Sequence, residues 1–162
     1  MKLLAALLVS STLLLGQQTQ QLVIDAKKFE ANDKKGISIF TGDVKIKMGK
    51  DKINAQKLEV FFVTKKESTA KIPSKYVATG KVDFEIITKE KHYIGKGNKI
   101  IYSPVDQEYT VIGNGFLQEK NDDKKIYGEK IYVNQLSGEA KVNGDDNKPV
   151  RIIINIERGS QK

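Results

Sequence analysis

A four-residue motif that occurs four times constrains the fold of this chain more than any other feature of its sequence. Each copy has a small residue, any residue, a lysine and a large apolar residue: AKKF at 26–29, AQKL at 55–58, GNKI at 97–100 and GEKI at 128–131. The small residue lies 16 positions before a glycine in three copies and 25 positions before it in the second. The longer interval contains a polar segment, 64–74. A recurring unit predicts stacked copies of one supersecondary structure.

The motif also marks a change of face in a strand. In an unbroken strand, Ala55 and Leu58 would point to opposite sides because side chains alternate. A bulge or sharp twist at the motif brings both residues to the same side, and Ala or Gly is favoured at such a site. Repeated in register, these bends would curl a sheet over on itself. An ordinary sandwich with a packed interior remains the alternative.

From Gln21 onward the sequence predicts an all-β fold. Val, Ile, Thr, Tyr and Phe alternate with charged residues in short runs, which is typical of strands with one apolar face. The runs are separated by turn-forming residues at 32–36, 48–51, 103–106, 121–123 and 136–138. We therefore expect an elongated, folded antiparallel sheet of stacked hairpins with an apolar inner groove.

The N-terminus has the pattern of a secretory signal peptide. Lys2 precedes an uncharged run of thirteen residues, 3–15, which is shorter than the roughly 20 residues that span a bilayer. Residues 1–16 are expected to be a cleaved signal peptide, with a retained anchor as the alternative. The expected location is the periplasm. Disulfides are allowed there but not required, which fits a chain without cysteine.

Composition argues against several functions. The chain has no cysteine and one histidine, His92, which excludes Cys/His zinc sites and Cys-His dyads within one chain. His92 is expected in an exposed turn, and the aspartates have no convergent partners, so no enzyme activity, metal or cofactor is expected. The net charge is +8, but the basic residues are spread along every strand and interleaved with acidic ones. This distribution argues against a nucleic-acid partner.

Three stretches resemble the LptA/OstA-like family of periplasmic lipopolysaccharide-transport proteins. They are GDVKIKMGKDKINAQKLEVFF at 42–62, GKGNKIIYSPVDQEYTVIG at 95–113 and KPVRIIINIE at 148–157. The resemblance covers roughly residues 21–157 and implies an OstA-like β-jellyroll domain, 17–162, that is open at both ends. It further implies a lipopolysaccharide carrier with acyl chains in the groove. The implied partners are an inner-membrane LptC-like component, an outer-membrane LptD-like translocon and further copies stacked end to end.

Within this interpretation, alternating apolar residues along the strands become candidates for the lipid-binding groove, with Phe84 and Phe116 as the leading aromatic anchors. The candidates are Val44, Ile46, Ile53, Leu58, Val60, Phe62, Val82, Phe84, Ile86, Ile94, Ile100, Tyr102, Val111, Phe116, Ile131 and Val133. Lys45 and Asp83, next to two of these candidates, are expected to face water.

Two rival functions remain open at this point. A membrane-anchored LptC-like component of the same pathway carries a similar sheet, and a non-lipid structural β-module could polymerise through the same strands. Lys45, Lys47, Lys50 and Lys52 could meet phosphates of the lipid or could only solubilise the sheet. The first and last strands, 21–31 and 149–157, are expected at the ends of the sheet, where unpaired edges accept strands from another chain.

Overall fold

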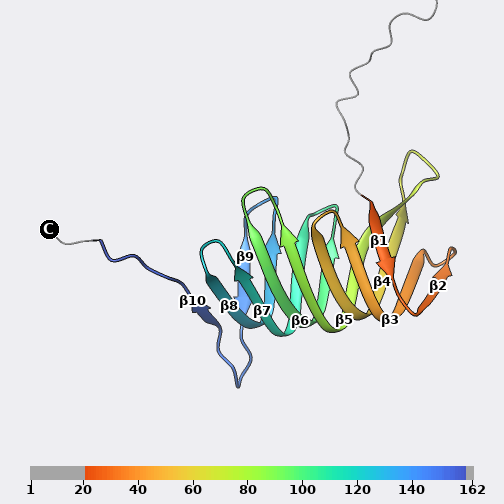
Figure 1. Ribbon diagram of the computed structural model, residues 1–162. Coiled ribbons are helices and arrows are strands. Elements are labelled where there is room, and N and C mark those ends of the chain that lie inside the picture. The colour runs from red at the N-terminus through yellow and green to blue at the C-terminus, as the bar shows by residue number, and fades with distance from the viewer. Residues whose placement is uncertain (1–20, 160–162) are drawn as a thin grey trace, which may run out of the picture.

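The computed structural model describes residues 21–159, which form ten antiparallel strands in a single sheet and no helix. The sheet is elongated, with strands that follow one another along its length (Figure 1). The strands are β1 (Leu22–Asp25), β2 (Lys28–Asn32), β3 (Ile37–Met48), β4 (Asp51–Thr64), β5 (Lys71–Ile87), β6 (His92–Ser103), β7 (Glu108–Glu119), β8 (Lys124–Asn134), β9 (Ala140–Asn143) and β10 (Arg151–Ile153).

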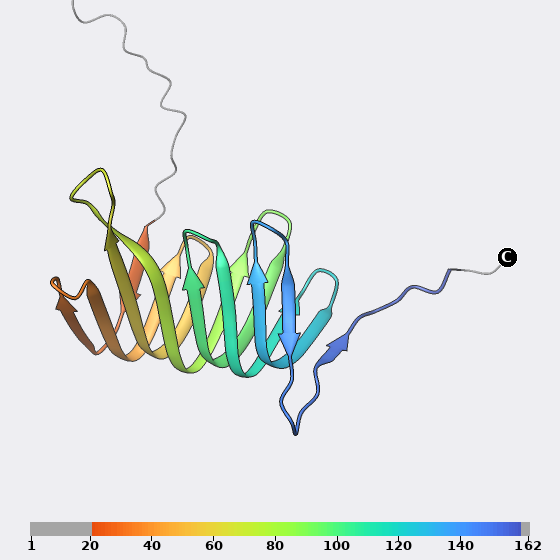
Figure 2. The same ribbon diagram turned by 180° about the vertical axis from the view of Figure 1, so that it is seen from behind.

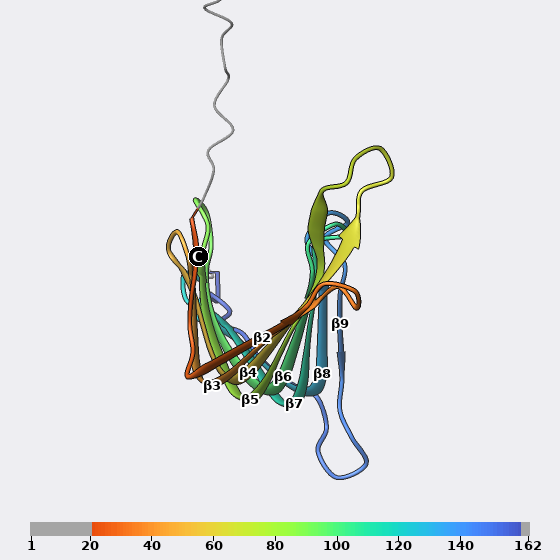
Figure 3. The same cartoon turned by 90° about the vertical axis from the view of Figure 1, so that its right-hand side faces the viewer.

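The sheet is folded lengthwise into two walls. β1 pairs with the C-terminal part of β3, and β2 pairs with its N-terminal part. At the other end of the sheet, β10 pairs with the N-terminal part of β8, and β9 pairs with its C-terminal part. Viewed along its length, the sheet has the form of a V (Figure 3). We define the first wall as β1, β10 and residues 44–48, 51–55, 82–87, 92–97, 115–119 and 124–128. The second wall is β2, β9 and residues 37–41, 57–64, 71–79, 99–103, 108–112 and 130–134.

The crease between the walls is built from repeated bulges. The strand register shifts at this level in every pair of long neighbouring strands from β3 to β8. On β3, β5 and β7 the crease contains a glycine and the residue after it, both with positive φ: Gly42–Asp43, Gly80–Lys81 and Gly113–Asn114. Glycine tolerates this conformation and Asn and Asp accept it more readily than most residues. These are the closing glycines of the sequence repeat.

The strands that alternate with these in the sheet, β4, β6 and β8, carry the four-residue motif at the crease. Ala55 and Leu58 are both buried in the same apolar core, so the motif changes the inward face as expected. Space at this level is scarce, because a Cβ on Gly80 would lie 2.6 Å from the side-chain oxygen of Gln56. A Cβ on Gly113 would lie 2.5 Å from the side-chain nitrogen of Asn98. The second residue of the motif, Gln56 or Asn98, therefore fills the space next to the glycine of the neighbouring strand.

The structure confirms the expected all-β, open, jellyroll-type sheet and its turns. The first and last strands lie at opposite ends of the molecule, as the two opposed views show (Figures 1 and 2). Each is shorter than expected: the first is divided into β1 and β2 at Ala26–Lys27, and β10 covers only Arg151–Ile153. The segment 64–74 belongs to the hairpin between β4 and β5, which rises above the second wall (Figure 3). The expected signal peptide, 1–16, lies outside the described residues. Within residues 21–159 no helix is long and apolar enough to cross a membrane.

The crowding at the crease yields a stability prediction. Gly80 (φ +87°) and Gly138 (φ +73°) have similar backbone conformations, but only Gly80 has atoms within 4 Å of an added Cβ. We expect Gly80→Ala to lower the free energy of unfolding by about 2–3 kcal/mol and Gly138→Ala by about 1 kcal/mol. Urea unfolding followed by circular dichroism measures both. Equal losses would show that the contact with Gln56 does not constrain the crease.

Candidate functional site

Two uninterrupted rows of small or apolar residues run along the inner faces of the walls. Each row follows direct cross-strand partners from one end of the sheet to the other. The row on the first wall is Ile24, Ile46, Ile53, Phe84, Gly95, Leu117, Ile126 and Ile152. The row on the second wall is Phe29, Phe40, Leu58, Ala78, Ile100, Val111, Ile131 and Val142. The two rows give the interior of the V an apolar lining along its whole length.

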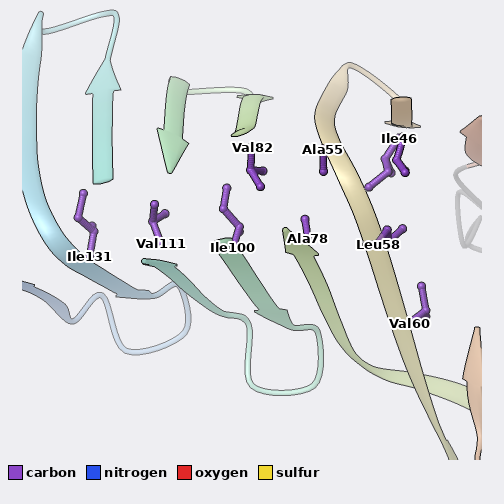
Figure 4. Close-up of a cluster of buried hydrophobic side chains, with 10 residues drawn as sticks. Ile46, Ala55, Leu58, Val60, Ala78, Val82, Ile100, Val111 and Ile131 are labelled. Carbon is purple, nitrogen blue, oxygen red and sulfur yellow. The ribbon is translucent and has the colours of Figure 1, made fainter. Parts of the chain in front are cut away.

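The N-terminal half of this interior is filled by closely packed apolar side chains. Val44 and Leu58 are each only 1% exposed, and Ile46 and Val60 are buried in the same cluster. The close-up shows Ile46, Leu58 and Val60 together with buried side chains of the next strands (Figure 4). Burying a side chain of this size contributes roughly 1.5–3 kcal/mol. In this half, the apolar rows act as the core of the protein.

The C-terminal half contains a cavity of about 460 Å³ between the walls, lined from β4 to β9. This volume falls within the range of about 300–1,000 Å³ that is typical of ligand sites. Phe84, Leu117 and Ile126 line it from the first wall, and Val111 and Ile131 from the second. The ring of Phe84 lies over Gly95, which has no side chain to fill that space. The exposed Gln135, Gly138 and Ala140 form its lip. The cavity is therefore apolar inside and reaches solvent at the rim of the second wall.

The sequence-predicted groove residues divide into three sets. The first set lines the cavity: Ile53, Phe84, Ile86, Ile100, Tyr102, Val111, Ile131 and Val133. The second set belongs to the apolar core and does not line the cavity: Val44, Ile46, Leu58, Val60, Phe62 and Val82. The third set, Ile94 and Phe116, lies on the outer face.

The prediction that Ile94 and Phe116 face the groove is wrong. Their chain neighbours Tyr93 and Leu117 line the cavity, so alternation turns Ile94 and Phe116 outward. Phe116 packs instead on Tyr127, with 5.0 Å between ring centroids, and the Lys96 ammonium lies 5.8 Å from its ring. Phe116 is therefore part of an aromatic and cationic cluster on the outside of the first wall.

Sequence reasoning missed several residues of the cavity. Tyr93, Tyr109, Leu117, Ile126 and Val142 line it but were not among the candidates. The signal that identifies Tyr93 is the motif itself, since a face change between Gly97 and Ile100 places odd-numbered residues of β6 inward before the crease. Leu117 follows from uninterrupted alternation with Val111 on β7.

Three tyrosines form a stack on the inner face of the second wall. The ring centroids of Tyr76 and Tyr102 lie 6.0 Å apart and those of Tyr102 and Tyr109 lie 4.3 Å apart. Burial is the main cause of a strongly raised pKa at Tyr109, with smaller contributions from Tyr102 and from the Asp51 carboxylate. Burial also raises the pKa of Tyr76. Tyr76 and Tyr109 thus stay neutral at physiological pH and give this wall polar tips without charge.

Within residues 21–159, acidic and basic side chains meet the cavity at one corner, the rim of the first wall. They are Lys91, Glu119 and Lys124. The Lys91 ammonium donates a hydrogen bond to the Glu119 carboxylate and lies 3.6 Å from Asp122. The bond to Glu119 is the main cause of a raised pKa at Lys91. Burial, followed by the Glu119 charge, raises the pKa of the neighbouring Tyr93.

His92 and Glu85 form a polar pair outside the cavity lining. His92 is half-buried at the start of β6, with its Nε2 2.8 Å from a Glu85 oxygen, so its expected place in an exposed turn is wrong. Both residues lie on the outer face, away from the cavity. Among residues 21–159 no group of three or more His, Asp or Glu side chains could hold a metal ion. Lys45 is exposed and follows an inward residue, as expected, and Asp83 accepts a hydrogen bond from Asn54.

Together these features define a folded antiparallel sheet of the open β-jellyroll type with an apolar interior. Residues 23–148 match the family described as LptA/(LptD N-terminal domain) LPS transport protein, and the chain belongs to this family. The expected family is therefore confirmed, and with it a function in lipopolysaccharide transport. No curated protein matches the sequence significantly.

A solved structure supports the fold independently. It is the crystal structure of LptH, described as the LptA homologous periplasmic component of the conserved lipopolysaccharide transport device from Pseudomonas aeruginosa. The TM-score is 0.70 at 16% sequence identity, and the match covers 85% of this chain and 96% of that chain. At this identity the likeness establishes the shared fold.

The buried tyrosine stack predicts an alkaline loss of stability. The pKa of Tyr109 is raised above its ordinary value of 10.0, so its stabilising contribution is complete below pH 10. It is lost as the pH rises from there toward the folded-state pKa, because the unfolded chain releases this proton first. We expect wild-type protein to lose more stability between pH 8 and pH 11 than Tyr109→Phe. Urea unfolding at both pH values provides the measurement, and identical pH dependence would contradict the assignment.

Proposed function

We propose that this protein is a periplasmic carrier that shelters the acyl chains of lipopolysaccharide between its two walls and passes the lipid from the inner toward the outer membrane. The observation that carries the proposal is the pair of apolar rows that run from one end of the sheet to the other. Family membership identifies the transported lipid, and the cavity between the walls gives acyl chains a place to lie. The proposal involves no catalytic step and no cofactor.

The distribution of polarity supports a lipid rather than a soluble ligand. The interior combines aliphatic and aromatic residues with neutral phenols, whereas lysines and acidic residues occupy the outer faces and the rims. Apolar burial at roughly 25 cal/mol/Å² favours a hydrocarbon chain in such a space without specifying its structure. The cavity-lining candidates that we propose to contact acyl chains are those of the first set above, from Ile53 to Val133. The core residues next to them would contact lipid only if the walls separated.

The ends of the sheet support assembly with other sheets. β1 and β2 at one end, and β9 and β10 at the other, each have a partner on one side only. Phe29 and Ile152 are exposed at these ends, together with Ile154 and Ile156 after β10. Unpaired strand edges with exposed apolar residues accept strands from another chain. We propose end-to-end contacts with further copies, with an LptC-like component and with an LptD-like translocon.

The proposed location is the periplasm, reached through the signal peptide at 1–16. Its support is the sequence pattern of the N-terminus together with the description of the similar LptH protein as periplasmic. Sequencing the mature N-terminus would separate a cleaved carrier from an anchored, LptC-like component.

The decisive test of the groove is a buried carboxylate. Phe84→Asp would place a charge among the apolar side chains of the cavity, where an acyl chain could no longer displace its water. We expect the variant to stay folded, because Phe84 lines an open cavity, and to lose at least tenfold in affinity for lipopolysaccharide. Photo-crosslinking or direct binding provides the readout, with circular dichroism to verify folding.

Two further variants interpret this result. Lys45→Asp places the same carboxylate on the outer face and should leave lipid binding within about twofold of wild type. Ile46→Asp should mainly destabilise the fold, because Ile46 belongs to the packed core and does not line the cavity. Unchanged lipid binding by folded Phe84→Asp would instead favour a structural module that polymerises without lipid.

The edge strands predict a second outcome. Deletion of residues 150–162 removes β10, which contributes only three paired residues to the sheet. We expect the shortened protein to keep its β-sheet circular dichroism spectrum and to lose self-association. Sedimentation velocity over a concentration series compares the two chains. Unfolding of the shortened chain would mean that β10 belongs to the core rather than to an assembly edge.

A further inference from the structure

The cavity has a strongly uneven charge distribution. In the part of the chain that the structure describes, its acidic and basic lining residues are Lys91, Glu119 and Lys124, which are gathered on the first wall between β6 and β8. The facing part of the second wall presents Asn134 and Gln135, which are uncharged. An amphiphile in this cavity therefore has one corner suited to a charged group and apolar surface elsewhere.

The two lysines at this corner differ in their partners. Lys91 is held by Glu119 and Asp122, so most of its charge is balanced locally. Lys124 is the direct cross-strand partner of Glu119 on β8, yet among the described residues it forms no ion pair. Because Glu119 and Asp122 both pair with Lys91, Lys124 supplies the cation at this corner that is available to a ligand.

The position of Lys124 connects this cation to the apolar floor. It lies on the same face of β8 as Ile126, two residues further along, and both line the cavity. Lys125 points to the opposite face, where its ammonium lies 3.6 Å from Asp123. A group bound by Lys124 thus sits at the first-wall rim of the cavity, with Leu117 and Ile126 next to it for the attached chain.

We infer that Lys124, flanked by the Lys91–Glu119 pair, binds the phosphate of a phosphorylated lipid and so fixes its orientation, with the headgroup at the rim of the first wall and the acyl chain on the cavity floor. A lysine ammonium is an effective phosphate ligand as a point charge. The low polarity of the adjacent lining strengthens the attraction compared with an exposed lysine on the outer face. This inference rests on the proposed function and adds a recognised headgroup and a direction to it.

The test uses three probes with the same twelve-carbon chain: dodecyl phosphate, laurate and the neutral dodecyl maltoside, each below its critical micelle concentration. Isothermal titration calorimetry measures their binding to wild type, Lys124→Gln and Lys125→Gln. The two variants lose the same charge from adjacent residues, so their long-range fields match. Inorganic phosphate serves as a fourth probe to identify a site that needs no hydrocarbon chain.

We expect Lys124→Gln to weaken dodecyl phosphate binding by roughly three- to tenfold and to leave dodecyl maltoside unchanged. Lys125→Gln should alter neither, and Lys124→Arg should retain the preference for the phosphate. Equal effects of Lys124→Gln and Lys125→Gln, or none from either, would overturn the inference while leaving the groove intact. A loss confined to laurate would overturn the phosphate assignment, and so would tight binding of inorganic phosphate alone. Failure of wild type to bind even dodecyl maltoside would overturn the proposed function and this inference with it.

Discussion

The whole structure depends on the crease that folds one sheet into two walls. A flat sheet with the same alternation would expose one apolar face to water, because no second layer covers it. The positive-φ pairs at Gly42, Gly80 and Gly113 bend β3, β5 and β7, and the small-x-Lys-apolar motif bends the strands between them. Both devices act at the same level of the sheet, so the bends align. The protein thus supplies its own second layer from the other half of each strand.

The apolar core runs along the whole crease, and the cavity lies over it in the C-terminal half, where Ile100, Val111 and Ile131 belong to both. In the N-terminal half, Val44, Leu58 and Val60 are almost fully buried and act as an ordinary core. In the C-terminal half, glycine occupies the inward position opposite Phe84 and the walls enclose a cavity. The same alternating pattern therefore serves two purposes, and the size of the side chains at the crease and in the rows decides which one applies locally.

The sequence was informative about the fold because its signals are local. Turn residues and the motif predict the hairpins and the face change, and the structure contains both. The groove was harder to predict, because each face assignment depends on how many residues the crease takes up. On β6 the motif changes the inward parity, so Ile94 points outward, whereas on β7 the pair Gly113–Asn114 preserves the parity, so Phe116 points outward as well. Alternation alone also could not separate core from cavity, since Ile46 and Ile53 are direct cross-strand partners and only Ile53 lines the cavity.

The pair of short strands at each end of the sheet has a geometric consequence. Among the described strands, each end of the molecule presents two separate edges, one on each wall. A neighbouring sheet that pairs with one wall is held close to the other, so the second pairing is effectively intramolecular. Engaging both walls also removes rotation about the long axis, which a single edge would permit. A chain of such subunits would keep its interiors aligned as one continuous trough, without any additional locking contact.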